Sequence, residues 1–587
     1  MFNKLSFSQK RIVVCNEPRI VIKACPGSGK TFSVTARLAR LLKCNNLNKH
    51  EGIAALSFTN TAANEIKNSL KENYQLKDID NPHFIGTIDS FINKYIFLPF
   101  GHLEMKCKTR PEIVGTEYNK WFEYNPSQTK YFKHKVTYRD PNYYFEMVSF
   151  KDVGNDRIPI PLRPPSSYHF SWDKIKNQDG SYNKKVNDII LSKEFHFKQG
   201  KAVQADANYF ALRILKKYPQ IAKDIALRFP ILIIDEAQDT TEIQMSIIDL
   251  LDSYGLKSIM LIGDPDQAIF EWNTANAELF NEKWNSSNWF QLALIENRRS
   301  STKICEYLNC FFNGNMISIG DNKDCPENPK IIGYEPEVDS VFDFCDSFMD
   351  KCNTMSISED NLAIVYRGRS FGEKHFGFVN TNLMNQESPW KNNHYYLRDI
   401  IQGKFLIEKG NLKLGFKQIE KGYHKYKNGI PFVSSGFLRE KINESSFREY
   451  RNELFQFIHS LPEISDKNLG TWVNEASSKF NFEYKLRFSN LKIDSLFHDE
   501  SKADDYSFIN TIHSVKGKSL DAILIFLVKK DNSNYTTLLR KDFNTLSIAN
   551  KEQMRIVYVA CSRPRKLLWL VVPNDDVVAW KRYFNIS

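Results

Sequence analysis

The sequence predicts an α/β protein with parallel sheets flanked by helices, and three stretches carry the prediction. RIVIKACPGSGKT (Arg19 to Thr31) is a β-rich run, a glycine-rich turn and the start of a helical pattern. FPILIIDEAQDT (Phe229 to Thr240) and SIMLIG (Ser258 to Gly263) contain aliphatic runs typical of strands buried in a parallel sheet. Acidic residues follow both runs, at the sheet edge where α/β proteins place their ligands.

The composition is that of a folded globular protein. Its 587 residues exceed one ordinary domain of roughly 100 to 200 residues, so we expect about four domains or subdomains. The apolar fraction of 42% and the charged fraction of 25% are near globular averages. A net charge of +11 and an aromatic content of 13% suit binding to nucleic acid, and they suit large cores equally well.

The cysteines and the apolar segments predict a cytoplasmic protein without a membrane partner. The ten cysteines form no CxxC pair and no zinc-ligand spacing, so we expect buried thiols in a reducing compartment. No stretch approaches the ~20 apolar residues of a membrane span. The N-terminus lacks the apolar segment of a signal peptide.

The loop CPGSGKT is the first element with a chemical role. Gly27 and Gly29 let backbone N–H groups point inward, and the N-terminus of the following helix favours an anion. Lys30 and Thr31 then reach a phosphate and Mg²⁺. Ala24 replaces the first glycine of the eight-residue pattern. A plain Gly/Ser turn is the alternative, but Gly-Lys-Thr at a strand-to-helix junction has few structural reasons to exist.

The acidic pair after the second run predicts nucleotide hydrolysis. Asp235 can hold the Mg²⁺ that Thr31 also contacts, while Glu236 is placed to orient and deprotonate the attacking water. If this stretch stood alone, a solvated acidic turn would be the alternative. The presence of the phosphate loop favours the hydrolytic interpretation.

The third run continues as LIGDPDQAIFEW (Leu261 to Trp272), which places a glutamine close to two large aromatic residues. Gln267 could sense the γ-phosphate through a hydrogen bond. If Phe270 and Trp272 stack on bases, a few residues link phosphate state to nucleic-acid contact, as a motor requires. Separately, the polar cluster could be a surface turn and the two rings could belong to the core.

Eight stretches in one order carry a family resemblance: ACPGSGKT, LSFTNTAANEI, GTIDSF, IIDEAQDT, GDPDQAIFEW, ENRRS, TIHSVKGKSLD and YVACSRPRK. This series closely resembles the superfamily 1A DNA helicases typified by UvrD, Rep and PcrA. The matching positions run from Gln9 to Lys566. The resemblance implies two RecA-like P-loop motor domains, each with an inserted, mainly helical subdomain.

The resemblance also assigns the nucleotide site. Gln9 looks like the glutamine that reads the adenine edge. Arg299 and Arg563 look like two arginines that reach the γ-phosphate from the second motor domain, which would tie hydrolysis to closure of a cleft; alone, each would be a surface charge. The expected catalytic residues are Lys30, Glu236, Gln267, Arg299 and Arg563, with Thr31 and Asp235 on the metal. The expected contacts to ATP come from Gln9, Gly27, Ser28, Gly29, Lys30, Thr31, Arg298 and Gly517.

A third set of residues resembles the DNA contacts of the family. Phe58 would stack on a base beside Thr59 and Asn60. A segment with Lys516 resembles the one that joins the DNA backbone to the nucleotide site. The expected DNA-binding residues are Phe58, Thr59, Asn60, Thr87, Phe91, Phe270, Trp272, Thr511 and His513, while Tyr366 and Arg367 mark a strand of the second motor domain.

Several positions depart from the family pattern. Arg298 stands where a tyrosine usually stacks on adenine, and Ser519 stands where a ribose-binding glutamate is expected. Stacking on the adenine must therefore come from the guanidinium of Arg298 or be weaker than in the family. Other departures, several of which remove positive charge near the expected DNA path or nucleotide, are Phe32, Thr61, Asp89 and Asn273. Because the hydrolytic residues are intact, the sequence supports ATP hydrolysis better than strand separation.

The motif spacing predicts two motor domains that are each interrupted. The first occupies residues 1–95 and 205–300 with an inserted subdomain at 96–204, and the second occupies 301–372 and 505–587 with an inserted subdomain at 373–504. The insertions contain basic aromatic stretches, KYFKHKVTYRD (Lys130 to Asp140) and KGYHKYK (Lys421 to Lys427). Such stretches can grip phosphates and stack bases, or they can be solvated loops over an aromatic core.

Three functions fit these observations. The first is an ATP-dependent DNA translocase and helicase acting on single-stranded DNA, with a 3′ to 5′ polarity implied only by the resemblance. The second is a nucleotide-gated DNA-sensing subunit that regulates a partner nuclease, because short members without their own nuclease resemble the helicase-like subunit of Gabija-type anti-phage defence, which is paired there with an OLD-family-like endonuclease. The third is a repair helicase acting alone. Because only a short segment follows Arg563, we expect no nuclease domain in this chain and expect any cutting of DNA to be done by another protein.

Overall fold

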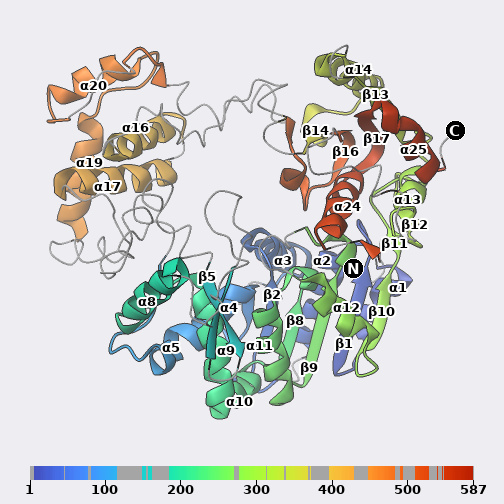
Figure 1. Ribbon diagram of the computed structural model, residues 1–587, viewed down its shortest axis with the longest axis horizontal. Coiled ribbons are helices and arrows are strands. Elements are labelled where there is room, and N and C mark those ends of the chain that lie inside the picture. The colour runs from blue at the N-terminus through green and yellow to red at the C-terminus, as the bar shows by residue number, and fades with distance from the viewer. Residues whose placement is uncertain are drawn as a thin grey trace. The chain divides into compact units, whose positions relative to one another are not determined.

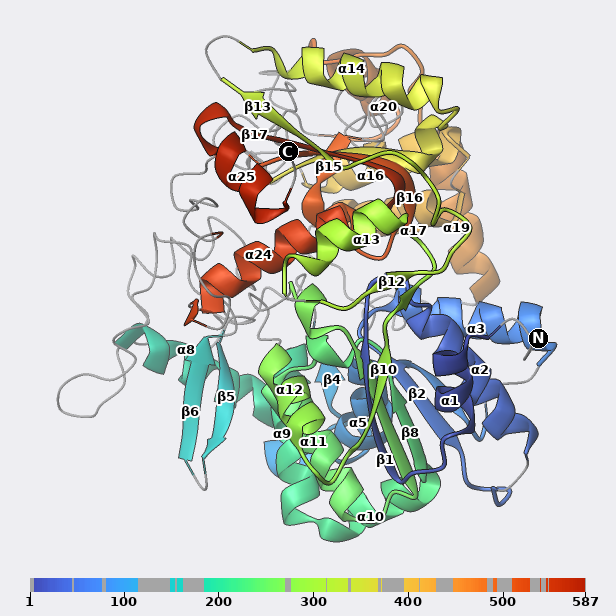
Figure 2. The same ribbon diagram turned by 90° about the vertical axis from the view of Figure 1, so that its right-hand side faces the viewer.

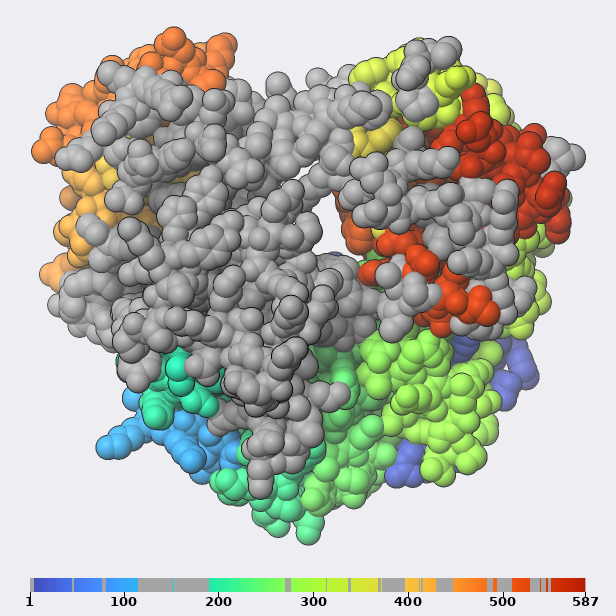
Figure 3. All heavy atoms as spheres, viewed as in Figure 1, coloured from blue at the N-terminus to red at the C-terminus, as the bar shows by residue number. Residues whose placement is uncertain are grey.

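A computed structural model gives the structure of the chain. It describes residues 5–44, 47–76, 81–114, 148–153, 156–161, 184–269, 276–312, 314–335, 339–367, 371, 395–410, 412–428, 447–482, 489–493, 509–527, 539, 545–546 and 548–585, which are coloured in Figure 1. In the space-filling view of Figure 3, atoms of residues whose placement is uncertain are grey. The chain divides into two compact units. The first comprises Met1–Ile113, Phe145–His375 and Asn510–Ser587, and the second comprises Val114–Tyr144 and Phe376–Ile509.

The first unit contains a six-stranded sheet with the strand order β10-β1-β9-β8-β2-β3, in which all neighbouring strands are parallel (Figure 1). Its strands are almost entirely apolar because both faces of the sheet are covered. The strands are β1 (Arg19–Ala24), β2 (Ile53–Ser57), β3 (Phe84–Thr87), β8 (Ile231–Ile234), β9 (Ser258–Gly263) and β10 (Phe290–Leu294).

Helices flank this sheet on both faces, as Figure 2 shows. Alternate side chains of β9 divide between two cores: Met260 and Ile262 face one core, and Ile259 and Leu261 face the other. The first core includes α1 (Phe7–Val14), α2 (Lys30–Lys43) and α3 (Asn60–Tyr74). The second includes α4 (Ile88–Ile92), the π-helix η2 (Asn93–Phe97), α9 (Gln204–Lys217), α10 (Pro219–Arg228), α11 (Glu242–Ser253) and α12 (Ala277–Asn285).

The same unit contains a second sheet with the strand order β13-β17-β16-β14-β15. Leu568 and Leu570 of β17 face a core with α13, α24 and α25, whereas the intervening Trp569 contacts Phe348 of α14 at a ring-centroid distance of 5.6 Å. Helices therefore cover both faces here as well (Figure 2). The elements are α13 (Thr302–Asn309), β13 (Lys330–Tyr334), α14 (Val341–Thr354), β14 (Leu362–Tyr366), β15 (Ile509–Thr511), η10 (Ile512–Val515), β16 (Leu520–Phe526), α24 (Ile548–Cys561), β17 (Pro564–Pro573) and α25 (Val577–Tyr583).

A smaller group of elements in the first unit surrounds its own core. Lys193 and Asp206 form a fully buried ion pair there, with Nζ 2.8 Å from Oδ1, and Phe150 packs against Tyr209. The elements are α5 (Leu98–Met105), β4 (Glu112–Ile113), the antiparallel pair β5 (Val148–Val153) and β6 (Asp156–Pro161), α8 (Lys184–Lys198) and β7 (Lys201–Ala202). The stretch 130–140 lies outside the described residues.

In its described residues the second unit is helical, with α16 (Tyr395–Glu408), α17 (Leu412–Asn428), α19 (Phe447–Ser460) and α20 (Leu469–Ser477). Glycines let α16 and α17 approach closely, because a Cβ at Gly403 would lie 2.7 Å from the carbonyl oxygen of Gly415. In the stretch 421–427, Tyr423 and His424 are buried, so these two aromatic residues belong to the core. Every helix of the described ranges is too short or too polar to cross a lipid bilayer.

Two parallel sheets flanked by helices confirm the predicted α/β fold class.

Candidate active site

The glycine-rich loop between β1 and α2 needs glycine at two positions. Gly27 and Gly29 have φ values of +68° and +75°, in the left-handed region that favours glycine. A Cβ at Gly27 would also lie 2.7 Å from the Cβ of Arg299. The hydroxyl of the buried Ser28 donates to the carbonyl oxygen of Cys25 over 2.7 Å and stabilises the turn. The loop therefore opens directly onto the N-terminus of α2.

Gln9 lies against this loop. Ser6 caps α1, and its N–H donates to Oε1 of Gln9 over 3.0 Å. The Nε2 of Gln9 donates to the carbonyl oxygen of Ser28, also over 3.0 Å. The buried Arg37 of α2 donates to the carbonyl oxygens of Ile12 and Cys15, which fixes the end of α1 to α2. The expected adenine-reading residue and the phosphate loop thus form one packed structure.

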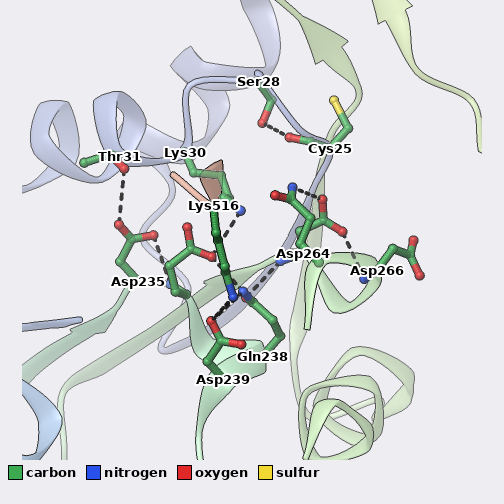
Figure 4. A network of polar contacts seen from close by, with 12 residues as sticks. Cys25, Ser28, Lys30, Thr31, Asp235, Gln238, Asp239, Asp264, Asp266 and Lys516 are labelled. Carbon is green, nitrogen blue, oxygen red and sulfur yellow. Dashed lines mark hydrogen bonds and ion pairs between the residues drawn. The ribbon is translucent and has the colours of Figure 1, made fainter. Parts of the chain in front are cut away.

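Asp235 lies just after the carboxyl end of β8, across from Lys30 and Thr31 (Figure 4), and Glu236 follows it in the chain. Oγ1 of Thr31 donates to Oδ2 of Asp235 over 3.4 Å, and Nζ of Lys30 lies 3.3 Å from Oε2 of Glu236. Glu236 has φ 54° and ψ 43°, a left-handed conformation that is rare for a residue with a side chain. This backbone turn lets two consecutive carboxylates point at two different partners.

The two carboxyl groups have opposite pKa shifts. Burial raises the pKa of Asp235, and the charge of Glu236 raises it further. Burial opposes ionisation of Glu236 as well, but Lys30 and Lys516 outweigh it and lower the pKa of this group. Asp235 provides a buried carboxylate beside the hydroxyl of Thr31, and the neighbouring Glu236 adds negative charge. Such oxygen ligands fit Mg²⁺. Thr31 and Asp235 are the residues that would hold the ion.

A second polar cluster lies at the end of β9. Oδ2 of Asp264 accepts from Nε2 of Gln267 over 2.6 Å, and Oδ1 of Asp264 accepts from the N–H of Asp266 over 3.1 Å. Oε1 of Gln267 accepts from Nη2 of Arg563. Gln267 is therefore held between a carboxylate of its own loop and a guanidinium that precedes β17. Phe270 and Trp272 lie outside the described residues.

Both expected arginines reach this region. Nη1 of Arg299 donates to the carbonyl oxygen of Ser562 over 3.0 Å, and Nε of Arg563 donates to that of Val559 over 2.9 Å. Burial and the charge of Arg563 lower the pKa of Arg299 to about 9. Burial lowers the pKa of Arg563 to about 10. Both groups therefore stay positively charged at neutral pH.

The remaining expected nucleotide contacts are at the surface. The side chain of Arg298 is exposed, and its N–H donates to the carbonyl oxygen of Gly27 over 2.9 Å. Gly517 is exposed and has φ +85°. Arg298 thus lies next to the phosphate loop, while Gly517 follows Lys516, which contacts Asp239.

Apart from Phe91, the expected DNA contacts within the described residues come partly from the first sheet and partly from the second. Phe58 is half-buried at the end of β2, followed by the exposed Thr59 and Asn60. Thr59 caps α3 by accepting from the N–H of Ala62 over 3.2 Å. Thr87 in the same way caps α4, and in the second sheet Thr511 is half-buried and His513 is exposed. These residues lie at helix starts or strand ends, with side-chain atoms at the surface.

Phe91 is an exception and requires a correction. Its ring is 2% exposed and packs between Phe84, Tyr95 and Phe229, with centroid distances of 5.5, 5.2 and 5.3 Å. A ring enclosed by three aromatic neighbours has no free face for a base. Phe91 therefore belongs to the core beneath β3 and is not part of the candidate DNA surface.

The sequence analysis does not single out Gln238 and Asp239, although both lie in the quoted stretch after Glu236. The short helix η5 (Ala237–Asp239) folds them back under the ends of β8 and β9, where both are buried. The Nε2 of Gln238 donates to Oε2 of Glu236 over 2.7 Å. The signal in the sequence is an amide and a carboxylate that follow the acidic pair after a single alanine.

The chain is similar in sequence to one protein family and to several known proteins. Residues 5–288 match the UvrD/REP helicase N-terminal domain. The chain is 25% identical to a probable DNA helicase II homolog of Mycoplasma capricolum over 54% of its length and 42% of that protein. It is 23% identical to the ATP-dependent DNA helicase PcrA of Leuconostoc citreum, over 83% of the chain and 63% of that protein. Identity to the Gabija protein GajB of Bacillus cereus is 22%, over 95% of the chain and 93% of GajB.

The chain thus spans less than two thirds of the first two relatives and nearly all of the third. The matches agree with the resemblance carried by the eight motifs, including its Gabija branch. They confirm the predicted recognition: residues 5–288 match the UvrD/REP helicase N-terminal domain, and the chain is similar to PcrA and to GajB.

Proposed function

We propose that the protein is an ATP-dependent DNA translocase and helicase that moves 3′ to 5′ on single-stranded DNA and hydrolyses ATP in a cleft between two RecA-like domains. The contact of Arg563 with Gln267 carries the proposal. It joins a residue at the end of β9 in the first sheet to a residue that directly precedes β17 in the second. A group from the second sheet thereby reaches the carboxyl ends of the strands that carry Lys30 and Glu236.

The distribution of strands supports the proposed domains. All six strands of the first sheet come from residues 1–95 and 205–300, and all five of the second come from 301–372 and 505–587. We assign these segments to the two motor domains. The segments 96–204 and 373–504 are then the inserted subdomains, and the second of these overlaps the compact stretch Phe376–Ile509.

The contacts around the loop give each residue a task with ATP and Mg²⁺. When bound, Mg²⁺ neutralises charge on the phosphate oxygens. Lys30 exchanges its contact with Glu236 for a phosphate, which frees the carboxylate to accept a proton from water. Arg299 and Arg563 stabilise the charge of the transition state, and Gln267 reports the occupancy of the γ-phosphate position. Gln9 and Arg298 contact the adenine base. The backbone N–H groups of Gly27, Ser28 and Gly29 donate to the phosphates. Gly517 also contacts the nucleotide.

For DNA, the proposal uses residues at the edges of both sheets. Phe58 with Thr59 and Asn60, and Thr87 nearby, contact the strand from the first motor domain, and Thr511 and His513 contact it from the second. The side chains of Phe270 and Trp272 stack on bases. The 3′ to 5′ polarity is implied only by the resemblance to the superfamily 1A helicases.

Steady-state ATP hydrolysis with and without single-stranded DNA tests this function, with Glu236→Gln as the control variant. We expect turnover in the wild type that DNA stimulates strongly, and almost none in Glu236→Gln. The variant keeps the shape of the side chain, so its binding of nucleotide shows that the site is folded. If single-stranded DNA does not stimulate ATP hydrolysis by the wild type, the proposed motor function is contradicted, even if the protein binds DNA.

A second function is favoured by one observation. The chain spans 93% of the Gabija protein GajB but 42% and 63% of the two helicase relatives, so its overall length corresponds to GajB. In this alternative, nucleotide-gated binding of DNA regulates a partner endonuclease, which we expect to be OLD-family-like, in anti-phage defence. Co-expression with an endonuclease encoded by a neighbouring gene tests it. A stable complex whose DNA cleavage responds to ATP supports the sensing role, and separate elution of the two proteins contradicts it.

We place the protein in the cytoplasm. All ten cysteines are free thiols, and Cys107, Cys305, Cys345, Cys352 and Cys561 among them are buried. Burial raises the pKa of Cys345 and Cys352 to about 12, so these thiols are unreactive at neutral pH. Unpaired thiols of this kind suit a reducing compartment.

A further inference from the structure

Gln238 is completely buried and uses both ends of its amide (Figure 4). Its Nε2 donates to Oε2 of Glu236 over 2.7 Å and to Oδ2 of Asp239 over 3.3 Å. Its Oε1 accepts from the N–H of Asp264 over 3.0 Å. One side chain thus contacts the candidate base, the loop after β9 and a neighbouring carboxylate.

The end of β9 is shaped around this amide. A Cβ at Gly263 would clash with Oε1 of Gln238 and would lie 3.1 Å from its backbone nitrogen. Gly263 needs no special backbone angle, so close approach of the amide is what requires glycine there. Only an amide offers the two donors and the acceptor that the three contacts use.

Asp239 connects the amide to the second sheet. Its Oδ2 accepts from Nζ of Lys516 over 2.9 Å, and Asp239 is 1% exposed. Lys516 lies between η10 and β16, next to the strands of the second sheet. Lys516 also lies near enough to Glu236 to lower the pKa of that carboxyl. The charged group of Lys516 is therefore linked to Glu236 through three contacts, its own ion pair with Asp239 and the two hydrogen bonds of Gln238.

The partners of Glu236 show why the amide matters during turnover. In this structure Oε2 of Glu236 is held by two donors, Nζ of Lys30 at 3.3 Å and Nε2 of Gln238 at 2.7 Å. Under the proposed function Lys30 turns to a phosphate. The amide of Gln238 is then the remaining one of these two donors, and its own position depends on Asp239 and on the backbone of Asp264.

We propose that Gln238 is a positioning residue that fixes the carboxylate of Glu236 and makes its position depend on the ion pair between Asp239 and Lys516. This inference rests on the proposed function. When the second sheet moves Lys516 away, Asp239 loses its partner, the shared amide shifts, and Glu236 is no longer held for proton transfer. Through this network the second motor domain controls the position of Glu236, the catalytic base. This control acts in addition to the contact of Arg563 with Gln267.

The test compares kcat and KM for ATP in three variants. Gln238→Leu keeps the volume of the side chain but removes all three hydrogen bonds, and Lys516→Met removes the charge; the double variant completes the cycle. We expect Gln238→Leu to lower kcat about 10- to 100-fold with KM within about threefold, because it disturbs the base and not the phosphate loop. If the two residues act as one unit, the double variant is no slower than Gln238→Leu alone.

Gln244→Leu is the matched control. Gln244 is also a buried glutamine near the start of α11, but its Nε2 donates to Oδ1 of Asp89, away from Glu236. We expect this variant to lower Tm without a comparable loss of kcat. Equal losses of kcat in Gln244→Leu and Gln238→Leu would show a purely structural role and overturn the inference, as would effects of Gln238→Leu and Lys516→Met that multiply.

Two further measurements keep the result decisive. If circular dichroism shows that Gln238→Leu does not fold, Asp239→Asn replaces it in the cycle with Lys516→Met, because it removes the same ion pair at constant shape. If the wild type hydrolyses no ATP, the proposed function fails, and the same cycle is then measured as the free energy of unfolding in urea. Non-additive free energies support the network, whereas additive ones overturn it.

Discussion

Nη2 of Arg563 donates a hydrogen bond to Oε1 of Gln267, although the two residues are 296 positions apart in the chain. Gln267 follows β9 of the first sheet, and Arg563 directly precedes β17 of the second. Both side chains are buried, at 5% and 3% exposed. A contact that buries a guanidinium between two sheets depends on their relative position, and it makes the proposed nucleotide site sensitive to any motion of the second sheet.

The first prediction concerns this arginine. Arg563→Ala should lower kcat for ATP hydrolysis by about 10³-fold or more, the range known for arginines that stabilise phosphoryl transfer. Affinity for an ATP analogue should change much less, because Lys30 and the phosphate loop are untouched. Steady-state kinetics and a binding titration measure the two effects separately.

Arg565→Ala is the control for that experiment. Arg565 lies two residues further on and forms an ion pair with Asp521, with Nη1 2.8 Å from Oδ1. Its side chain is 35% exposed, and its pairing is worth little in water. A similar loss of turnover in both variants would show that positive charge in general matters, and not the specific position of Arg563.

The second prediction concerns Mg²⁺. Asp235→Asn should raise the Mg²⁺ concentration needed for half-maximal turnover by at least about tenfold, since it removes one charged oxygen ligand. Chelation with EDTA should abolish turnover in the wild type, and added Mg²⁺ should restore it. A mutant with a wild-type Mg²⁺ titration curve would exclude Asp235 as a ligand.

The third prediction is a pH dependence of stability. Burial raises the pKa of Asp239 to about 6, although the charge of Lys516 lowers it, and Glu236 and Lys30 act in opposite directions. Because the folded protein holds this proton more tightly than the unfolded chain, the contribution to stability is complete below the ordinary value of 3.8 and is lost as pH rises through about 6. At 1.36 kcal/mol per pH unit, the loss is about 3 kcal/mol.

Asp239→Asn removes this titration and keeps the shape. We therefore expect the wild type to lose stability relative to Asp239→Asn between pH 4.5 and pH 7, as measured by denaturant unfolding without nucleotide. Other carboxyl groups titrate in both proteins, so their effects cancel in the difference. Parallel curves for the two proteins would mean that Asp239 titrates normally in the folded state.

The fourth prediction separates two phenylalanines. Phe91→Ala should destabilise the protein by about 3 to 5 kcal/mol, because its ring is enclosed in the core. Phe58→Ala, at a half-buried position, should instead weaken binding of single-stranded DNA with a smaller effect on unfolding. Urea unfolding and fluorescence anisotropy with a labelled oligonucleotide measure both properties in each variant. A selective loss of DNA binding in Phe91→Ala would contradict its assignment to the core.

The fifth prediction concerns Trp272, which lies outside the described residues. Trp272→Ala should reduce DNA-stimulated ATP hydrolysis and spare the basal rate, because a stacking ring acts only when DNA is present. Both rates are measured in one experiment with increasing oligonucleotide. An equal loss of both rates would identify the ring as part of the core.

Local patterns in the sequence were sufficient to predict the strands and the phosphate loop. The aliphatic runs before Asp235 and Asp264 are strands because both faces of a parallel sheet are buried, and Gly27 and Gly29 have the backbone angles that the loop requires. These features depend on residues that are close together in the chain. The fold class followed from them.

The position of Phe91 and the role of Gln238 could not be predicted in this way. Phe91 follows a helix cap in a motif with surface contacts, but its direction is set by Tyr95 and Phe229, which the motif does not include. Gln238 bonds to the backbone of Asp264, 26 positions away, through a turn that exists only when β8 and β9 are neighbours. Such contacts depend on the pairing of strands and are absent from any short stretch.

The left-handed backbone of Glu236 carries a trade-off between stability and activity. A residue with a side chain in this conformation costs about 1 to 2 kcal/mol, which glycine would not. Glycine would relieve this strain, but it would also remove the carboxylate that Lys30 and Gln238 contact. The strained turn therefore marks Glu236 as a residue kept for its side chain.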